Sequence, residues 1–464
     1  MDKAKPALFR RCLNIPVPDN ENTGAAKCLP FTRSDVRCTP GQPRQQFNGN
    51  TAFINGSLIY GSDEQTASRL SKYDGGLMIV SDKFQETNLP TRSQCGFESP
   101  NIQPGGFNEN DLVAGDVRAI VQPTMASIHT LFLAEHNRIA KELQPRLAKQ
   151  FVARRMSPTE ADELIYQETR ATVGAELQQI VYEEYLPVVL GQQAYKRYGL
   201  NLETDSAYDP SVDPSILNEF STVAFRFGHS TVSDHFDGNP PGWSLSNQFF
   251  KFDDFAACVP NERKKETSQD NNGDCWISEM HKAIEQPSAA GDMLVGEALR
   301  EKLFNASSAK FGDPIKEDLV ARNIQRAREH GIPSYGDLRK ACGMEPLHYD
   351  ERPDEINHEK WNAIIKVYHS AADIDPFTGG LAETSPNDGI VGPLFACIIG
   401  KQFQKLRDGD RYFFTHSHGP YARGLGENTK RSIRNRSFGD ILCDNQGSDI
   451  SGQTTRFPLY GNIK

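Results

Sequence analysis

The 464-residue sequence lacks the long apolar runs of a membrane helix, since its longest ones, such as Tyr185–Leu190 and Pro393–Gly400, fall far short of roughly 20 residues. It also has no block of Lys and Arg, and its 51 basic and 61 acidic residues leave a net charge of −10. These absences argue against a membrane span and against a nucleic-acid partner. No apolar core follows the basic residues of MDKAKPALFRRC, so no secretory signal peptide is visible.

Cysteine pairs at the spacing of a zinc site are missing as well. The nine cysteines are scattered, and the closest two lie ten residues apart. Together with glycosylation sequons at Asn55, Asn305 and Asn435, this scatter favours a secreted disulfide framework, although nine reduced cytosolic thiols are the alternative. The odd number of cysteines leaves at least one without a partner inside the chain.

Helical periodicity begins at Met125. Apolar residues then recur at spacings of three, four and seven, namely Met125, Ile128, Leu131, Phe132, Ile139 and Leu143. Residues 157–160, with the sequence Ser-Pro-Thr-Glu, have the composition of a capping box with proline in the first turn. This motif predicts the start of a second helix, which is expected to stop near Pro187 or Gly191.

The rest of the chain also favours helices over strands. Further helices are predicted over 289–304, 356–370 and 390–406, and strand-like alternation is sparse. Residues 237–288 are rich in Asn, Asp, Gly and Pro and are predicted to form a long loop or insertion. Because no repeat or Pro/Ser linker divides the chain, the sequence predicts a mainly α protein with one large domain over 1–464, long loops and few short strands.

Histidines are the first candidates for a metal or cofactor site. His129 and His136 lie seven residues apart on one helical face, but no carboxylate stands at zinc-protease spacing, so helix packing is favoured. His229 lies in the apolar stretch TVAFRFGHSTV, with Arg226 one turn earlier and Gly228 beside it. From the residues alone a core histidine is the favoured interpretation, although the same pattern describes the proximal side of a haem pocket.

Several long blocks of the sequence resemble the animal haem peroxidase family. They are LVAGDVR, ASIHTLFLAEHNRIAKEL, YEEYLPVVLG, VAFRFGHS, NIQRAREHGIPSYGDLRKACG and VGPLFACIIGKQFQKLRDGDRYFF, in the family's order from about residue 28 to 445. The resemblance implies a helical haem-peroxidase domain that holds haem b. It further implies an extracellular, disulfide-bonded protein that uses hydrogen peroxide to oxidise halide, tyrosine or phenolic donors.

The resemblance assigns roles to individual residues. His229 matches the proximal ligand of the haem iron, and Arg226 matches an arginine that pairs with a haem propionate. Asp373 takes the place of an asparagine that bonds the Nδ1 of that histidine, so more imidazolate character and a lower iron reduction potential are expected. Arg118 matches the distal arginine, whose fixed charge polarises bound peroxide. From the residues alone, a salt bridge with Asp116 explains Arg118 equally well.

Three departures from the family pattern bear on activity. The family's distal histidine lies in a Gln…Asp-His motif upstream of the stretch with which this chain begins, so the domain is expected to be N-terminally incomplete. Val121 stands in place of the glutamate that forms an ester with the haem, so no ester link is expected. The calcium loop corresponds to Thr51, Phe53, Asn55 and Ser57, and the loss of carboxylates, with Asn55 in place of an aspartate, is expected to weaken calcium binding severely.

These departures leave two function hypotheses. The first is a haem peroxidase acting on hydrogen peroxide and a small donor. The second is a catalytically impaired homologue that binds haem or interacts with extracellular matrix proteins. The resemblance also implies a disulfide between Cys342 and Cys397, while Cys258 and Cys275 are candidates for a local pair within the 237–288 loop.

Overall fold

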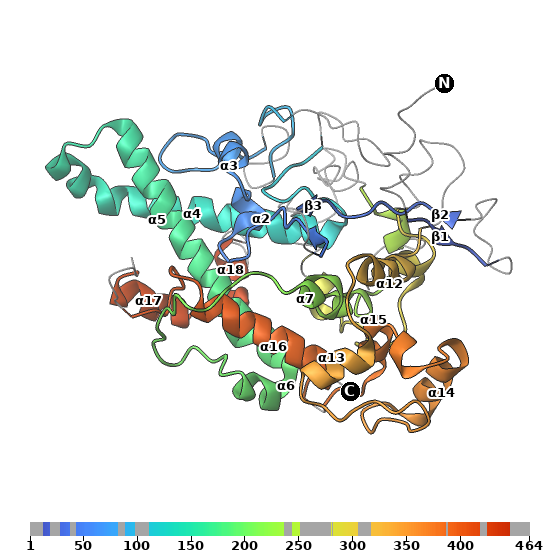
Figure 1. The fold of residues 1–464 in the computed structure, drawn as a ribbon. Helices are drawn as coiled ribbons and strands as arrows, with labels where there is room; N and C mark the ends of the chain where they lie inside the picture. The colour runs from blue at the N-terminus through green and yellow to red at the C-terminus, as the bar shows by residue number, and fades with distance from the viewer. Residues whose placement is uncertain are drawn as a thin grey trace.

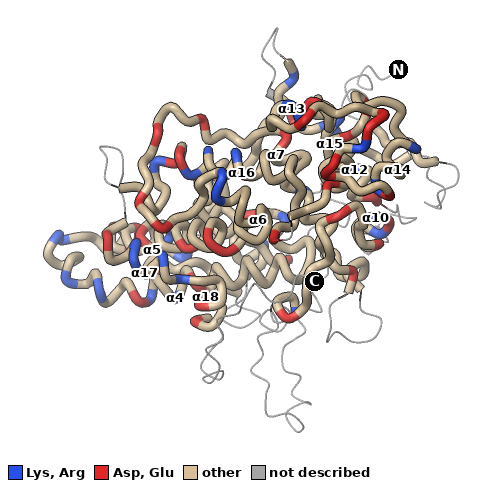
Figure 2. Tube along the Cα trace, turned by 90° about the horizontal axis from the view of Figure 1, so that it is seen from below, with Lys and Arg blue, Asp and Glu red and all other residues tan. Residues whose placement is uncertain are grey.

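The structure is a computed structural model that describes residues 13–18, 28–37, 43–81, 89–97, 111–235, 244–250, 280, 282–304, 317–386, 388–417 and 425–445. Within these ranges the molecule consists mainly of helices (Figure 1), as the sequence predicts. Basic and acidic residues are interspersed along the helices (Figure 2), which agrees with the absence of a Lys/Arg block. None of the helices in the described ranges is both long and apolar enough to cross a bilayer.

The strands form two short antiparallel pairs near the N-terminus. β1 (Ile15–Pro16) pairs with β2 (Cys28–Leu29), and β3 (Val36–Arg37) pairs with β4 (Gln45–Gln46). In the segments between these strands, Arg33, Ser34 and Arg44 contact Glu329 at the C-terminal end of α12 (Leu319–Glu329). The N-terminal segment is thereby held against that helix.

Two long helices form a hairpin that projects at the left of Figure 1. α4 (Pro123–Arg154) carries the apolar pattern that begins at Met125, and α5 (Pro158–Ile180) packs against it. The predicted capping box is confirmed, since the Ser157 hydroxyl accepts from Glu160 N, and the Glu160 carboxylate accepts from Ser157 N. α5 continues through a π-helical turn, Val181–Tyr185, into α6 (Leu186–Arg197), where Gly191 breaks the helical backbone at φ +73°.

The other helical segments are shorter. They are α2 (Ser57–Tyr60), α3 (Glu64–Leu70), α7 (Asn218–Thr222), η2 (Ala224–His229), η3 (Leu245–Asn247), α10 (Glu297–Arg300), α13 (Tyr335–Ala341), α14 (His358–Val367), η5 (Ala371–Asp373), α15 (Pro376–Ala382), α16 (Pro393–Asp408), α17 (Glu427–Arg434) and α18 (Phe438–Asn445). The helices predicted over 356–370 and 390–406 are confirmed as α14 and α16. The prediction over 289–304 is wrong for most of its length, because only α10 is α-helical there. Most of 237–288 lies outside the described residues.

The helices enclose two large hydrophobic clusters. One joins α6, α15 and α16 with η2, around fully buried side chains such as Leu190, Phe377 and Phe395. The other lies between α2, α4 and α5, around Tyr60, Leu131 and Val173. The expected disulfide between Cys342 and Cys397 is confirmed and ties the end of α13 to α16. Of the described cysteines, Cys28, Cys95 and Cys443 are unpaired, and Cys258 and Cys275 lie outside the described ranges.

Candidate active site

His229 is the last residue of the 3₁₀ segment η2, which follows directly on α7. Buried Ala224 and Phe227 fix η2 against the core, so the half-buried imidazole is carried by a rigid element. Gly228 leaves space beside the ring, because a Cβ there would meet no atom closer than 4.0 Å. Burial and the neighbouring Arg226 charge lower the pKa of His229 to about 4, so the ring is neutral at pH 7.

Asn323 is the group that holds the ring. Its Nδ2 lies 2.8 Å from Nδ1 of His229, and its Oδ1 accepts a hydrogen bond of 2.7 Å from Nη1 of Arg226. The side chain is fully buried on α12. The Nε2 of His229 makes no hydrogen bond within the described part of the chain, so this nitrogen is the one open to a ligand.

Sequence reasoning missed Asn323 and placed Asp373 at this position instead. The structure contradicts that placement: Asp373 lies exposed on η5, and its carboxylate accepts a hydrogen bond from the Ser370 hydroxyl at 2.7 Å. With an amide rather than a carboxylate on Nδ1, the basis for a lowered iron potential falls away. A signal was present in the sequence, because Asn323 is a polar residue among the apolar positions Leu319, Val320 and Ala327 of a short helix.

Arg226 lies beside His229, as the sequence predicted, and is half-buried. Besides its bond to Asn323 it donates Nε–H to the Ser221 carbonyl. It forms no ion pair with any carboxylate of the described residues, and burial together with the Arg326 charge lowers its pKa to about 10. A guanidinium without a counter-charge in such a place favours an anionic partner.

A small apolar cluster connects the segment after Arg118 with the segment after His229. Its buried members include Leu245, Phe249 and Leu303. Val121, Val232 and Leu319 pack against it, three residues after Arg118, three after His229 and four before Asn323 respectively. Phe250 N also donates to the Val121 carbonyl at 3.2 Å. The structure therefore gathers the candidate distal and proximal segments around one hydrophobic centre.

Arg118 forms an ion pair with Asp116. Its Nε and Nη2 contact the two carboxylate oxygens of Asp116 at 2.9 and 2.5 Å, and 63% of its side chain is exposed. This ion pair raises the pKa of Arg118 and lowers that of Asp116. The salt-bridge alternative considered from the sequence is thus realised in the structure.

His129 lies near this ion pair. The Asp116 and Arg118 charges both act on its ring, whereas burial is the main cause of its lowered pKa. Its Nδ1 contacts the Met125 carbonyl at 2.7 Å and must carry the proton, so Nε2 is an acceptor. That nitrogen is buried and has no partner within the described residues. The favoured interpretation of His129 as a packing residue remains compatible with its burial in α4.

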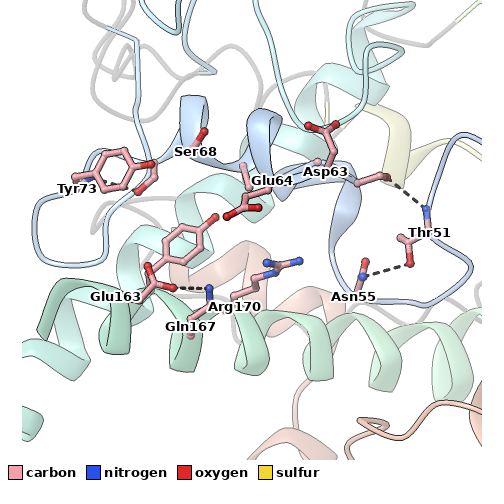
Figure 3. A pocket seen from close by; sticks show the side chains of 14 residues that line it. Thr51, Asn55, Asp63, Glu64, Ser68, Tyr73, Glu163, Gln167 and Arg170 are labelled. Atoms are coloured by element: carbon pink, nitrogen blue, oxygen red, sulfur yellow. Dashed lines mark hydrogen bonds between the residues drawn. The ribbon is translucent and has the colours of Figure 1, made fainter. Parts of the chain in front are cut away.

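In the loop that corresponds to the family's calcium site, the polar groups form hydrogen bonds with one another. Asn55 donates from Nδ2 to the Thr51 hydroxyl at 3.4 Å and accepts from Ser57 N at 3.1 Å, while Thr51 Oγ1 accepts from Phe53 N at 3.2 Å. Thr51 and Asn55 line a cavity of about 410 Å³ opposite Arg170 of α5 (Figure 3). No cluster of three or more His, Cys, Asp or Glu residues suited to a metal exists among the described residues.

Known proteins resemble this chain over most of its length. The sequence model of the family described as "Animal haem peroxidase" matches residues 2–457. The chain is 33% identical over 466 residues to thyroid peroxidase of Rattus norvegicus, covering 94% of this chain and 47% of that protein. It is 33% identical over 450 residues to myeloperoxidase of Homo sapiens, covering 94% of this chain and 56% of that protein. The chain thus spans about half the length of these relatives.

Solved structures agree on the fold. Peroxidase A from Dictyostelium discoideum matches with a TM-score of 0.70 at 24% identity, over 94% of this chain and 80% of that one. A fatty acid alpha-dioxygenase from Arabidopsis thaliana matches with a TM-score of 0.68 at 16% identity, over 98% and 73% of the two chains. At such identities the likeness concerns the fold, while the family match rests on the sequence. The chain therefore belongs to the animal haem peroxidase family.

Proposed function

We propose that this chain is a haem-dependent peroxidase that uses hydrogen peroxide to oxidise a small donor such as a halide, a tyrosine or a phenol. One observation carries the proposal. His229 ends a rigid helical segment with its Nδ1 held by buried Asn323, while Nε2 has no protein partner among the described residues. A histidine in this state is typical of an axial ligand to haem iron.

The residues around His229 suit haem b. Arg226 offers an uncompensated positive charge for a propionate, and the partly buried Val121 and Val232, at the edge of the apolar cluster, offer apolar contacts for the porphyrin. Val121 contributes a methyl surface and no carboxylate, so the haem would be held without the ester that the family's glutamate forms. The proposal does not require calcium, since the Asn55 side chain donates to the Thr51 hydroxyl and accepts from the Ser57 backbone N–H.

Each residue then has a limited task. Bound haem would supply the redox chemistry with peroxide; the protein has to hold and orient it. His229 would ligate the iron and Asn323 would fix the plane of its ring. Arg226 would bind a carboxylate of the cofactor, and the apolar cluster would exclude water. Arg118 would supply positive charge on the other side once released from Asp116.

The second candidate is a catalytically impaired homologue that binds haem or interacts with extracellular matrix proteins. The state of Arg118 favours it, because the guanidinium is bonded on two sides by Asp116 and faces solvent. Loss of a general base typically lowers turnover on the order of 10²- to 10⁴-fold, so slow peroxide turnover is compatible with this second candidate. Secretion is proposed alongside either function, and the exposed sequon residue Asn435 is a suitable glycosylation site.

Reconstitution with haemin tests the proposal. The purified chain is titrated with haemin, the Soret band is recorded, and peroxide-dependent oxidation of a phenol is measured. We expect a Soret band that requires His229, so that His229→Ala loses it whereas His348→Ala, which removes an exposed histidine, keeps it. A spectrum identical in wild type and His229→Ala would refute the assigned ligand. A His229-dependent complex that is inert to peroxide would favour the impaired homologue.

A further inference from the structure

A cavity of about 620 Å³ lies between α5, the loop of residues 53–55 and the segment 409–414. Its floor is one face of α5, whose residues recur at helical spacing, namely Gln167, Arg170, Ala171, Gly174, Ala175 and Gln178. The middle of this face carries only glycine and alanine, which leaves the hollow open between two polar ends. A cavity of this size is typical of sites that bind small organic molecules.

Gln178 holds two walls of this cavity together. Its Nε2 donates to the Ile54 carbonyl at 2.9 Å, and its Oε1 accepts from Phe414 N at 3.0 Å. The side chain is buried, so the amide is a fixed part of the structure. Phe53, Tyr208 and Phe414 line the walls with aromatic rings. The cavity is therefore preformed and has apolar surfaces on several sides.

Asp410 brings a carboxylate without a counter-charge to the cavity wall. Only 5% of the residue is exposed. Its Oδ1 accepts from Tyr412 N at 2.8 Å, whereas Oδ2 has no hydrogen-bond partner in the described ranges. Neighbouring Arg411 donates to the Tyr412 hydroxyl at 2.6 Å instead of pairing with Asp410. Burial raises the pKa of Asp410 to about 6, so the group is still ionised at pH 7 and favours a cationic partner.

Arg170 brings the opposite charge. Its guanidinium lies 5.3 Å from the centre of the Tyr60 ring and forms no ion pair with any carboxylate that the structure describes. Figure 3 shows the side chain extending from α5 into a neighbouring cavity, which it also lines. Arg170 and Gln178 are two turns apart on α5, about 12 Å along the helix. No positive charge lowers the pKa of Asp410, so the two unpaired groups line one cavity without being adjacent.

We propose that this cavity binds a short apolar peptide with free termini, with its ammonium group on Asp410 and its carboxylate on Arg170. Three extended residues span about 10 Å, which suits two charges that are apart, whereas a single amino acid carries both charges on one carbon. The side chains of the peptide would pack against Phe53 and Phe414. Hydrogen bonds between charged groups are the strong ones, so the termini would fix the peptide's direction. The inference concerns binding alone and does not depend on haem.

Peptides with capped termini test the proposal without any substitution. Binding of Phe-Ala-Phe, of its N-acetyl form and of its C-terminal amide is measured by isothermal titration calorimetry at pH 7. Acetylation removes the ammonium charge and amidation removes the carboxylate, while the apolar groups stay the same. Because a hydrogen bond to a charged group contributes more than a neutral one, each cap should weaken binding by roughly 10- to 100-fold.

Substitutions on the protein identify which residue reads which terminus. Asp410→Asn keeps the shape and the acceptor for Tyr412 N, and should bind the free and the N-acetyl peptide equally. Arg170→Gln should bind the free peptide and the amide equally, and Arg170→Lys should keep the preference for the free carboxylate. Asp350→Asn and Lys149→Gln remove exposed charges elsewhere and should behave as wild type. Circular dichroism checks that each variant is folded.

The outcomes are distinct from those of the haem experiment. If wild type binds the three peptides equally, or binds none of them at millimolar concentration, the inference is overturned. Peptide binding that Asp410→Asn and Arg170→Gln leave unchanged lies elsewhere on the protein and overturns it too. A chain that fails to bind haemin through His229 but shows the two crossed selectivities would refute the proposed function and support the peptide site.

Discussion

Three histidines of this protein differ in what their ring nitrogens meet. In His136 both nitrogens are bonded, since Nε2 lies 2.8 Å from the Gly76 carbonyl and Nδ1 lies 2.9 Å from the Tyr60 hydroxyl. In His129 only Nδ1 is bonded within the described residues, and in His229 the bond is made by an amide. The first ring is a structural residue with both nitrogens bonded, whereas Nε2 of the other two rings has no partner among the described residues.

Removal of the Tyr60 hydroxyl tests the structural assignment of His136. The ring donates Nε2–H to Gly76, so Tyr60→Phe leaves a buried Nδ1 lone pair without a donor, which typically costs about 1–3 kcal/mol. Urea denaturation should show this loss as a lower midpoint with an unchanged slope. Tyr412→Phe, at a side chain that is 58% exposed, is the matched control and should change stability little. Equal midpoints for the two variants would contradict the assignment.

At the residue scale the sequence singled out His229 and Arg226 as candidates, because their neighbours in the chain carry the pattern, but it did not single out Asn323. The amide is 94 residues from the histidine that it contacts, and only the packing of α12 against η2 brings them together. Asp373 was chosen on a short local likeness, and the same folding that delivers Asn323 leaves Asp373 on the surface. Buried polar residues on apolar helix faces are the signal that deserves more weight.

Helices with their own capping signals were predictable, and those that begin at a remote residue were not. α4, α5, α14 and α16 follow apolar periodicity or local caps. α10 instead begins where the Asp234 carboxylate accepts from Glu297 N and Ala298 N at 2.7 and 2.9 Å. That cap is 63 residues away, so no local pattern could reveal that only four residues of the predicted helix would form.

Gly191 interrupts the helical backbone that continues from α5 into α6, and it is one of the two residues near which the sequence predicts the helix to stop. Its φ of +73° and ψ of 157° lie in a region that is essentially restricted to glycine, and a Cβ there would stand 2.8 Å from Asp388 Oδ1. Gly191→Ala should therefore destabilise the protein by about 1–3 kcal/mol in thermal or urea unfolding.

Gly174→Ala is the matched control for this change. Gly174 lies inside α5, and a Cβ there would meet nothing closer than 3.8 Å, so the control should leave stability unchanged or raise it. If both alanine variants were equally stable, backbone conformation would not be what interrupts the helix at Gly191.

Over the whole molecule, buried ionisable groups act on stability in opposite directions. Burial raises the pKa of Glu176 to about 8, of Glu383 to about 7 and of Asp410 to about 6, and it lowers the pKa of His136, His229 and His330 to about 4. The carboxyl groups make the native state less stable as pH rises from their unfolded pKa to their folded one. The histidines make it less stable as pH falls from about 6.5 to about 4. The two sets offset each other across mildly acidic pH.

Substitution of Glu383 should reveal how one buried carboxyl group contributes to the pH dependence of stability. In wild type the Glu383 carboxyl binds more protons when folded than unfolded between pH 4.5 and about 7, so its contribution falls as pH rises through that window. Glu383→Gln removes this slope, and its stability relative to wild type should improve from pH 4.5 to 7.5 in urea denaturation. Glu359→Gln, on the exposed face of α14, serves as control. A relative stability that stays constant with pH would contradict the assigned shift.

The overall architecture was predictable because the sequence blocks that resemble the family are long and occur in the family's order. The contacts between segments that are distant in the sequence were not predictable. Neither the clustering of Val121, Val232 and Leu319 nor the contact of the N-terminal strands with α12 has a local pattern in the sequence. Such contacts depend on how complete helices pack, and the composition of each segment leaves many packings open.

The contacts between the N-terminal segment and Glu329 of α12 affect how fast that helix can open locally. Glu329 is contacted by Arg33, Ser34 and Arg44, and Phe31 stacks under Arg326 at 4.2 Å, so the helix that carries Asn323 cannot open by itself. Its local opening requires the segment to detach first. The residence time of any group held at His229 would then depend on these surface contacts as well as on its bond to the histidine. Because Arg33 and Arg44 contact Glu329 through ion pairs, concentrated salt would shorten the residence time.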